Sequence, residues 1–249
     1  MAFRGLLINI VIKRPLSMIN LVKGQNEKLS MDVFHVGLGW DVQEDNNGYD
    51  FDLDVSAFMI GRNKKLLNDN YLVFYNSEEP FRVLTSCPTK PEKYDSAKYP
   101  PYTDNDGNQV TSYEHWRRKT RPISPEYSVI GSIDDMDGLT SENGDDETMD
   151  IDLSKVNPEV NEIVIAVSIY DYQNRNQNFG QVERAYVRLY KAGQEADGEG
   201  EYIYDLTEDF SACASVEFCR LYRHNGEWKV QALGLGHHGG LEELLAKYQ

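Results

Sequence analysis

Carboxylate side chains are concentrated in two short stretches of the chain, and their spacing suits the binding of a hard cation. Six Asp or Glu residues fall within 41–54 and nine within 134–152, and neither range contains a Lys or Arg. Because the formal net charge is −16, the remaining residues sum to about −1. Concentrated like charges destabilise a compact fold unless they point into water or share a cation. The placement of these acids is therefore the main functional signal in the sequence.

The first acidic stretch has the alternation of a β-strand. Asp50, Asp52 and Asp54 are separated by the apolar residues Phe51 and Leu53. Successive side chains of a strand point to opposite faces, so the three acids share one face and the apolar residues face the core. Same-face residues lie roughly 6.6 Å apart, which lets two carboxylates reach one ion or flank two neighbouring ones.

The second acidic stretch is a loop by composition. Gly138 and Gly144 permit sharp turns, and Thr140 and Ser141 add hydroxyl oxygens to the carboxylates. Calcium takes about six to eight oxygen ligands in flexible geometry, whereas magnesium demands stricter octahedral geometry. Softer metals are not favoured, since neither stretch contains Cys or His. A solvated acidic face without a metal is the alternative that composition alone leaves open.

Two local patterns resemble the start of an EF-hand loop but do not complete one. The Asp50-x-Asp52-x-Asp54 pattern has Val55 where the turn glycine is required. The run from Asp104 to Gly107 has that glycine but lacks an acid at both ends of the loop register. We expect it to be a hairpin turn instead.

The elements that must position these acids are mostly strands. Short segments that alternate apolar and polar residues, or are rich in β-branched and aromatic types, predict strands at 34–37, 49–59, 71–75, 148–153, 162–170, 185–191, 202–206, 215–222 and 228–233. Helical periodicity is scarce: single turns are expected near 158–161 and 181–183, and a short terminal helix at 241–248. With turn residues such as Asn225-Gly226 between the strands, the pattern predicts an all-β fold, an antiparallel β-sandwich with few short helices.

The chain is expected to form a single domain, residues 1–249, with an N-terminal extension at 1–16 and an insertion at 80–130. The insertion holds seven of the nine prolines, five tyrosines and a basic patch from His115 to Arg121. Long irregular segments within compact domains are uncommon and often functional. The patch is expected to be a solvated strand or turn that pairs with the protein's own acidic surface; an anion or nucleic-acid contact is the alternative.

Composition also limits partners and compartment. A pI near 4.7 argues against nucleic acid or an anionic membrane as a partner. The three cysteines are scattered, without a disulfide or zinc spacing, and indicate a reducing compartment. The apolar run at 6–12 is too short for a signal peptide and is followed at once by Lys13-Arg14-Pro15. We therefore expect a cytoplasmic protein without membrane insertion.

Seven motifs in order along the chain resemble the TerD family of tellurium-resistance and stress proteins, which are calcium-binding β-sandwiches. They are Val36-Gly37-Leu38-Gly39-Trp40-Asp41, Phe51-Asp52-Leu53-Asp54-Val55-Ser56-Ala57-Phe58, Phe74-Tyr75-Asn76, Gly144-Asp145-Asp146-Glu147, Asp152-Leu153-Ser154-Lys155-Val156, Gln177-Asn178-Phe179-Gly180-Gln181-Val182 and the run from Leu221 to Lys229. The resemblance covers roughly 17–78 and 130–241. The insertion at 80–130 departs from it.

The resemblance implies a set of calcium ligands. The Asp-x-Asp strand and the Gly-Asp-Asp-Glu loop of this chain resemble the motifs that bind calcium in the family. The residues carried over are Asp52, Asp54, Asp145, Asp146 and Glu147, together with Asp137 from a loop motif that lacks the family's flanking glycine. The implied cofactor is Ca²⁺. The expected partners are calcium ions and, through the surface that the insertion adds at 80–130, other stress-response proteins.

Three functions compete for the acidic motifs. The first is a non-enzymatic, calcium-binding stress protein in which the ion stabilises or switches the fold. The second is a metal-dependent hydrolase or phosphoryl-transfer enzyme, although no His or Lys lies within either stretch to act as a base, and His35 is the nearest in sequence. The third is a calcium-dependent, lectin-like module in which Trp40 and Trp228 would stack on a ligand, although both fit core aromatic residues better.

Overall fold

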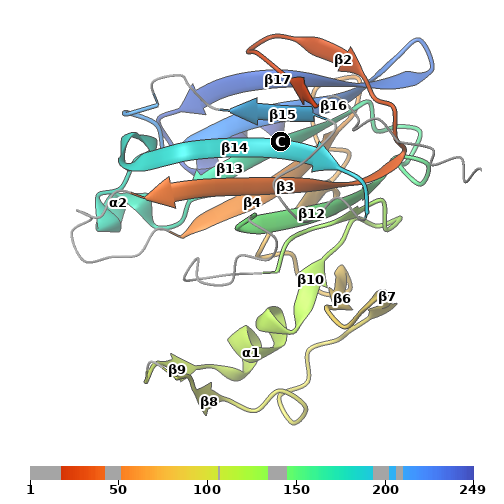
Figure 1. Cartoon of the computed structure of the whole chain (residues 1–249). Helices are drawn as coiled ribbons and strands as arrows, with labels where there is room; N and C mark the ends of the chain where they lie inside the picture. Colours follow the sequence, from red (N-terminus) through yellow and green to blue (C-terminus); the bar gives the residue numbers. More distant parts are fainter. Residues whose placement is uncertain (1–17, 43–51, 106, 134–144, 193–201, 206–209) are drawn as a thin grey trace, which may run out of the picture.

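The computed structural model describes residues 18–42, 52–105, 107–133, 145–192, 202–205 and 210–249. Within these ranges the chain forms two six-stranded sheets that face each other, and a smaller unit that protrudes from them (Figure 1). The expected N-terminal extension at 1–16 lies outside the described residues, as do most of the two acidic stretches.

The first sheet has the strand order β1-β15-β14-β3-β12-β11. Its strands are β1 (Ile19–Asn20), β15 (Tyr202–Asp205), β14 (Val182–Tyr190), β3 (Val33–Val42), β12 (Glu147–Asp152) and β11 (Val129–Ile130). All neighbours are antiparallel except β1 and β15, which run parallel.

The second sheet has the strand order β2-β17-β16-β13-β4-β5 and is antiparallel throughout. Its strands are β2 (Asn26–Lys28), β17 (Glu227–His237), β16 (Ser215–His224), β13 (Glu162–Ile169), β4 (Leu53–Ile60) and β5 (Leu72–Val73). Asn225 and Gly226, with φ of 52° and 81°, form the tight turn between β16 and β17, as their sequence predicts.

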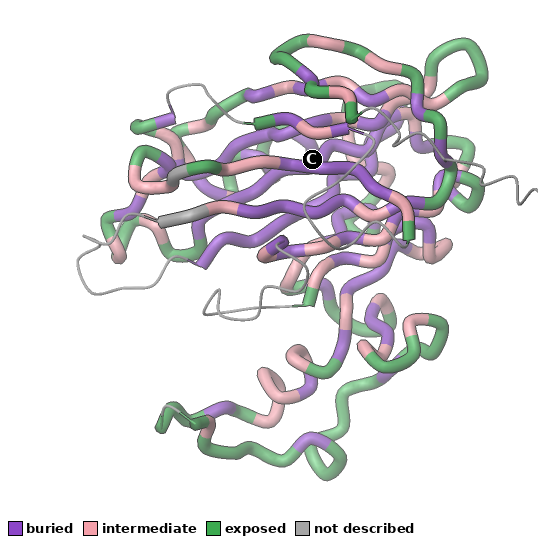
Figure 2. Tube along the Cα trace, viewed as in Figure 1, coloured by how far each residue is buried: buried purple, intermediate pink, exposed green. Residues whose placement is uncertain are grey.

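The main core lies between the two sheets, where the purple tube of Figure 2 is densest. Strand β4 shows how the alternation works: Leu53 and Val55 face this core, whereas Phe58 and Ile60 face the opposite side. That outer face is covered by the terminal helix α3 (Leu241–Tyr248). Both faces of β4 are therefore buried, and Asp54 on this strand is buried with them.

The inserted segment folds into small elements of its own. They are β6 (Arg82–Leu84), β7 (Cys87–Pro91), β8 (Tyr102–Thr103), β9 (Gln109–Val110), α1 (Ser112–Arg118) and β10 (Thr120–Pro122). Strands β10, β6 and β7 form a three-stranded sheet beside the sandwich, while β8, β9 and α1 project outward (Figure 1). The β8–β9 hairpin turns at Asp104 to Gly107, as predicted, with Gly107 at φ 88°.

Arg82 ties the insertion to the sandwich. Its fully buried guanidinium donates to the Thr120 hydroxyl and carbonyl and to the carbonyls of Tyr75, Ser77 and Arg117, at 2.8–3.3 Å. All five N–H groups of the side chain are thus used, which is what burial of a guanidinium requires.

Most predicted elements are confirmed, and the differences are local. The antiparallel β-sandwich is present, and every predicted strand overlaps an observed one. The single turn expected at 158–161 is present as a hydrogen-bonded turn at Pro158 and Glu159, without a helix, whereas short helices occur at η1 (Asp69–Tyr71), α2 (Tyr172–Arg175) and η2 (Phe179–Gln181). No helix among the described residues is long and apolar enough to cross a membrane.

The basic patch from His115 to Arg121 was expected to be a strand or turn, and that prediction is wrong for its first half. Residues 115–118 lie in α1, because Thr111 and Glu114 form a reciprocal capping box that starts a helix. The expected pairing with acidic residues holds for Arg121, whose Nη1 lies 2.8 Å from Asp150 Oδ2.

Candidate functional site

The two acidic motifs meet at one end of the sandwich. Glu147 begins β12 in the first sheet, and Val55 lies near the start of β4 in the second sheet. The Val55 amide donates to Glu147 Oε2 at 3.0 Å. Strand β5 pairs with β4 only from Ala57 onward, so the carboxylate takes the place of a strand partner at this edge. The contact joins a residue of one acidic motif to the backbone of the other, 92 positions apart.

Asp52 and Asp54 lie on the β4 side of this end, and both are buried. The Asp52 carbonyl accepts from the Tyr170 amide at 2.8 Å, which extends the pairing of β4 with β13 by one step. Asp54 is opposite Ser168 in the same ladder. The prediction put Asp50, Asp52 and Asp54 on one strand face; Asp50 lies outside the described residues, Asp52 directly precedes β4, and Asp54 lies on it, so the fold adds burial of Asp52 and Asp54.

Asp146 is held at the end of β3. Its amide donates to the Leu38 carbonyl, and its Oδ2 accepts from the Trp40 amide, both at 2.8 Å. These two bonds fix the half-buried carboxylate at the same end of the sandwich as Glu147. Trp40 itself packs against the main core, as expected for a core aromatic residue.

Asp145 has a different environment from its neighbours. Its two oxygens accept from Arg188 Nε at 2.7 Å and Nη2 at 2.9 Å, and Oδ1 also accepts from the Tyr186 hydroxyl at 3.0 Å. Both side chains of the Arg188 pair are fully buried. Burial and the Asp145 charge raise the pKa of Tyr186, which keeps its hydroxyl as a donor. The carboxylate thus closes a buried ion pair, which is a structural role.

Gly37 makes room for this ion pair. A Cβ at position 37 would lie 2.0 Å from Asp145 Oδ2. Any side chain there would push the carboxylate off Arg188, so the glycine of the first motif and the acid of the fourth motif form one packing unit.

The remaining predicted ligand, Asp137, lies outside the described residues, as does the rest of 134–144. Within the part of the chain that the structure describes, no group of three or more His, Cys, Asp or Glu side chains is arranged to hold a metal ion. The donors that do gather at this end are carboxylates and carbonyls, a set that suits a hard cation such as Ca²⁺. A complete site would need further oxygens.

His35, the nearest histidine to the first acidic stretch in sequence, is engaged elsewhere. Its Nδ1 lies 2.7 Å from Asp150 Oδ1 in the middle of the first sheet, and its ring packs on Tyr190. Asp150 is half-buried between His35 and Arg121. Burial would raise the pKa of Asp150, but the hydrogen bond from His35 and the charge of Arg121 hold it below its usual value.

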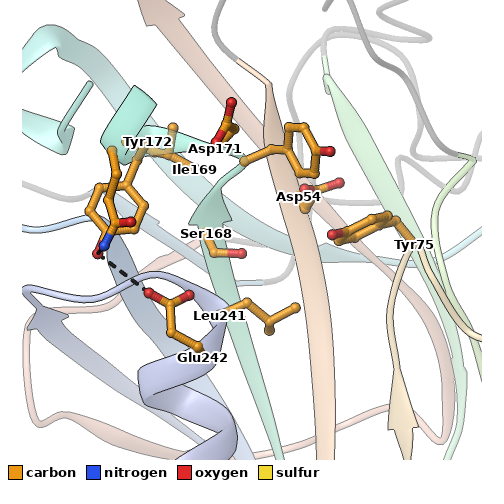
Figure 3. A pocket seen from close by; sticks show the side chains of 10 residues that line it. Asp54, Tyr75, Ser168, Ile169, Asp171, Tyr172, Leu241 and Glu242 are labelled. Atoms are coloured by element: carbon orange, nitrogen blue, oxygen red, sulfur yellow. Dashed lines mark hydrogen bonds between the residues drawn. The ribbon is translucent and has the colours of Figure 1, made fainter. Parts of the chain in front are cut away.

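A cavity of about 220 Å³ opens beside the acidic end, on the outer face of β4 and β13 (Figure 3). Asp54 is in its wall, together with Asp171 at the start of α2 and Glu242 at the start of α3. Asp171 and Glu242 do not lie in either acidic stretch. Their positions are the signal that the sequence offers: Asp171 follows a predicted strand, and Glu242 lies at the start of a predicted helix.

Comparison with known proteins gives the family. The model of the TerD domain family matches residues 18–84 and 121–248. The chain belongs to the TerD family. The two matched segments leave 85–120 between them, and the described part of this gap carries β7, β8, β9 and α1 of the protruding unit.

Relatives of the TerD family cover nearly all of the chain. Tellurium resistance protein TerD of Serratia marcescens is 36% identical over 236 residues, covering 92% of this chain and 96% of the relative. General stress protein 16U of Bacillus subtilis (strain 168) is 33% identical over 235 residues, covering 92% and 96%.

Solved structures agree on the fold. A homologue of telluride resistance protein (TerD) from Streptomyces coelicolor A3(2) matches with a TM-score of 0.53 at 13% identity, covering 86% of this chain and 95% of that chain. At this identity the likeness supports the TerD β-sandwich and nothing about its ligands. All seven motifs of the resemblance fall within or overlap the matched segments of the family model.

Proposed function

We propose that this TerD-family protein is a non-enzymatic, calcium-binding stress-response protein whose two acidic motifs are linked by Ca²⁺. The observation that carries the proposal is the 3.0 Å contact between Glu147 Oε2 and the Val55 amide, which places the Gly-Asp-Asp-Glu loop against the Asp-x-Asp strand. The names of the relatives, tellurium resistance protein and general stress protein, support a role in resistance to chemical stress.

The proposed ligands are Asp52, Asp54, Asp146 and Glu147, with Asp137 from the segment outside the described residues. Asp145 is left out of this set because Arg188 engages both of its oxygens. A bound calcium ion would supply two positive charges to a cluster of buried and half-buried carboxylates, whose burial is otherwise costly. It would thereby link the ends of β4 and β12 across the two sheets.

Two histidines of the described residues are engaged in the fold, which favours a binding role over hydrolysis with a histidine base. General acid–base catalysis needs a titratable group within hydrogen-bond reach of the reacting water. His35 is paired with Asp150, and His237 with Glu217 at 2.7 Å. Both imidazoles are thus used in the fold.

Calorimetric calcium titration tests the proposal with matched variants. We expect Asp52→Asn and Asp146→Asn each to weaken calcium binding by at least about tenfold, since each removes a charged oxygen ligand. Glu159→Gln is the control, because Glu159 is exposed at the opposite end of β4 and β13. Wild-type affinity in both Asp variants, or an equal loss in the control, would rule out the assigned site.

A further inference from the structure

The cavity beside the acidic end has a buried floor and an exposed rim. Asp54 and Ser168, which are opposite each other on β4 and β13, form its buried floor. Asp171 and Glu242 lie at its exposed rim, with Tyr170. Figure 3 shows the Ser168 side chain projecting into the space between Asp54, Leu241 and Glu242.

The wall of this cavity combines carboxylates with aromatic rings. Three acids and the three tyrosines Tyr75, Tyr170 and Tyr172 line it, and none of the described residues in the wall is Lys, Arg or His. The negative face of an aromatic ring attracts a cation, and neighbouring carboxylates add to that attraction. The cavity therefore selects for positive charge.

Two of the rings already hold cations of the protein itself. The Arg117 guanidinium lies 5.0 Å from the centroid of Tyr75, and that of Arg175 lies 5.4 Å from the centroid of Tyr170. Tyr75 and Tyr170 also meet edge to face, with centroids 6.0 Å apart and an interplanar angle of 89°. The two rings are thus fixed in place at the cavity wall, each in contact with one guanidinium of the protein.

The floor offers a hydrogen-bonding group, the Ser168 hydroxyl, that faces the cavity. Ser168 is 3% exposed, and none of the residues that the structure describes makes a hydrogen bond with its hydroxyl. A buried polar group normally has a partner, and a cavity is where a ligand or water supplies it. A hydroxyl next to Asp54 favours a ligand that carries N–H donors.

The size and the apolar part of the wall define the ligand further. The cavity has a volume of about 220 Å³, whereas one water molecule in liquid water occupies roughly 30 Å³. The cavity is therefore large for a single metal ion without other ligands. Ile169 and Leu241 give an apolar surface between floor and rim. This arrangement suits methylene groups between two positively charged ends.

We propose that this cavity binds a small alkylammonium ligand of the polyamine class, with one ammonium group at Asp54 and Ser168 and another at Asp171 and Glu242. The methylene chain lies between Leu241 and the tyrosine rings. Of the proposed calcium ligands that the structure describes, Asp54 alone lines this cavity, so the two sites are adjacent and separable by mutation of the rim.

The test is isothermal titration of the full-length protein with spermidine, in about 0.15 M salt to screen diffuse charge and with EGTA, so that calcium does not occupy Asp54. We expect saturable binding of one spermidine per chain. Tyr170→Leu removes an aromatic ring and is expected to weaken spermidine binding at least about fivefold. Glu242→Gln removes a rim carboxylate and is expected to weaken spermidine binding about tenfold. Ser168→Ala should weaken spermidine binding while leaving the binding of tetramethylammonium, which has no N–H group, unchanged.

Matched controls separate this site from the overall negative charge. Glu243→Gln removes the neighbouring acid of α3, which does not line the cavity, and Tyr94→Leu removes an exposed tyrosine of the insertion. Both should bind spermidine like the wild type. Absence of saturable binding, or equal losses in rim and control variants, would overturn the proposal.

The outcome is independent of the proposed function. Tyr170→Leu and Glu242→Gln do not alter any proposed calcium ligand, so their calcium affinity is expected to match the wild type. Loss of spermidine binding with intact calcium binding supports the polyamine site. Intact spermidine binding in a chain that binds no calcium would leave this site standing and remove the proposed function.

Discussion

At the scale of single residues, the acids of one motif have divided roles. Asp146 and Glu147 bind backbone amides of β3 and β4, whereas Asp145, next to them in sequence, is enclosed by Arg188. The spacing of the motif predicts three equivalent carboxylates. It cannot reveal the Arg188 pair, because that contact joins positions 43 apart through a strand pairing that only the fold defines.

Breaking the Arg188 pair is expected to destabilise the protein strongly. Arg188→Met leaves the Asp145 carboxylate buried without its cation, and the expected cost is about 3–5 kcal/mol of unfolding free energy. Urea denaturation followed by circular dichroism measures it. The double variant Asp145→Asn/Arg188→Met should recover part of the loss, since no buried charge remains. A cost below about 1 kcal/mol in the single variant would contradict the assigned role of the pair.

At the scale of elements, hydrogen bonds to the buried carboxylate of Glu217 hold the terminal helix α3 against the second sheet. Glu217 on β16 accepts from the Tyr248 hydroxyl at 2.9 Å and from the Lys247 ammonium, both on α3, and from His237 Nε2 on β17 at 2.7 Å. Burial would raise the pKa of Glu217, but these hydrogen bonds outweigh it and hold the pKa below the usual 4.5.

This contact predicts a loss of stability in acid. Because the folded pKa of Glu217 lies below the unfolded value, the unfolded chain binds more protons between them. The stabilisation is present above about pH 4.5 and is lost as the pH falls through the folded pKa. Glu217→Gln should therefore flatten the fall of melting temperature below that pH, whereas Glu78→Gln, at an exposed position, should not. An unchanged acid slope in Glu217→Gln would count against this account of α3.

The strands were predictable from the sequence because apolar residues that alternate with polar ones, and runs rich in β-branched and aromatic residues, follow directly from which side chains a strand buries. The observed β13 (Glu162–Ile169) differs from the predicted segment 162–170 by one residue. Helix α1 was missed, although the Thr111-x-x-Glu114 capping box that starts it is visible in the sequence. Asp171 and Glu242 were missed for another reason: the cavity that unites them with Asp54 is formed by α2, α3 and two strands, and no local pattern encodes it.

At the scale of the whole molecule, the insertion differs from the sandwich in charge as well as in shape. Residues 85–120, between the two segments that match the family model, contain six Lys or Arg and five Asp or Glu, in a chain of net charge −16. Arg82 fixes the base of this unit, and Arg117 reaches from α1 to Tyr75 at the cavity wall. That the unit contacts other stress-response proteins stays a prediction, as does a cytoplasmic location.

The central claim concerns the end of the sandwich where the two acidic motifs come together around the Glu147–Val55 contact. A ligand that binds only the folded state stabilises it, by about 2.7 kcal/mol at a hundredfold excess over the dissociation constant. The most direct measurement is the melting temperature of the wild-type chain in EGTA and at increasing free calcium. The account predicts a melting temperature that rises with calcium and is lowest in EGTA, with magnesium at equal concentration giving a smaller rise. A melting temperature unchanged between EGTA and millimolar calcium would contradict it.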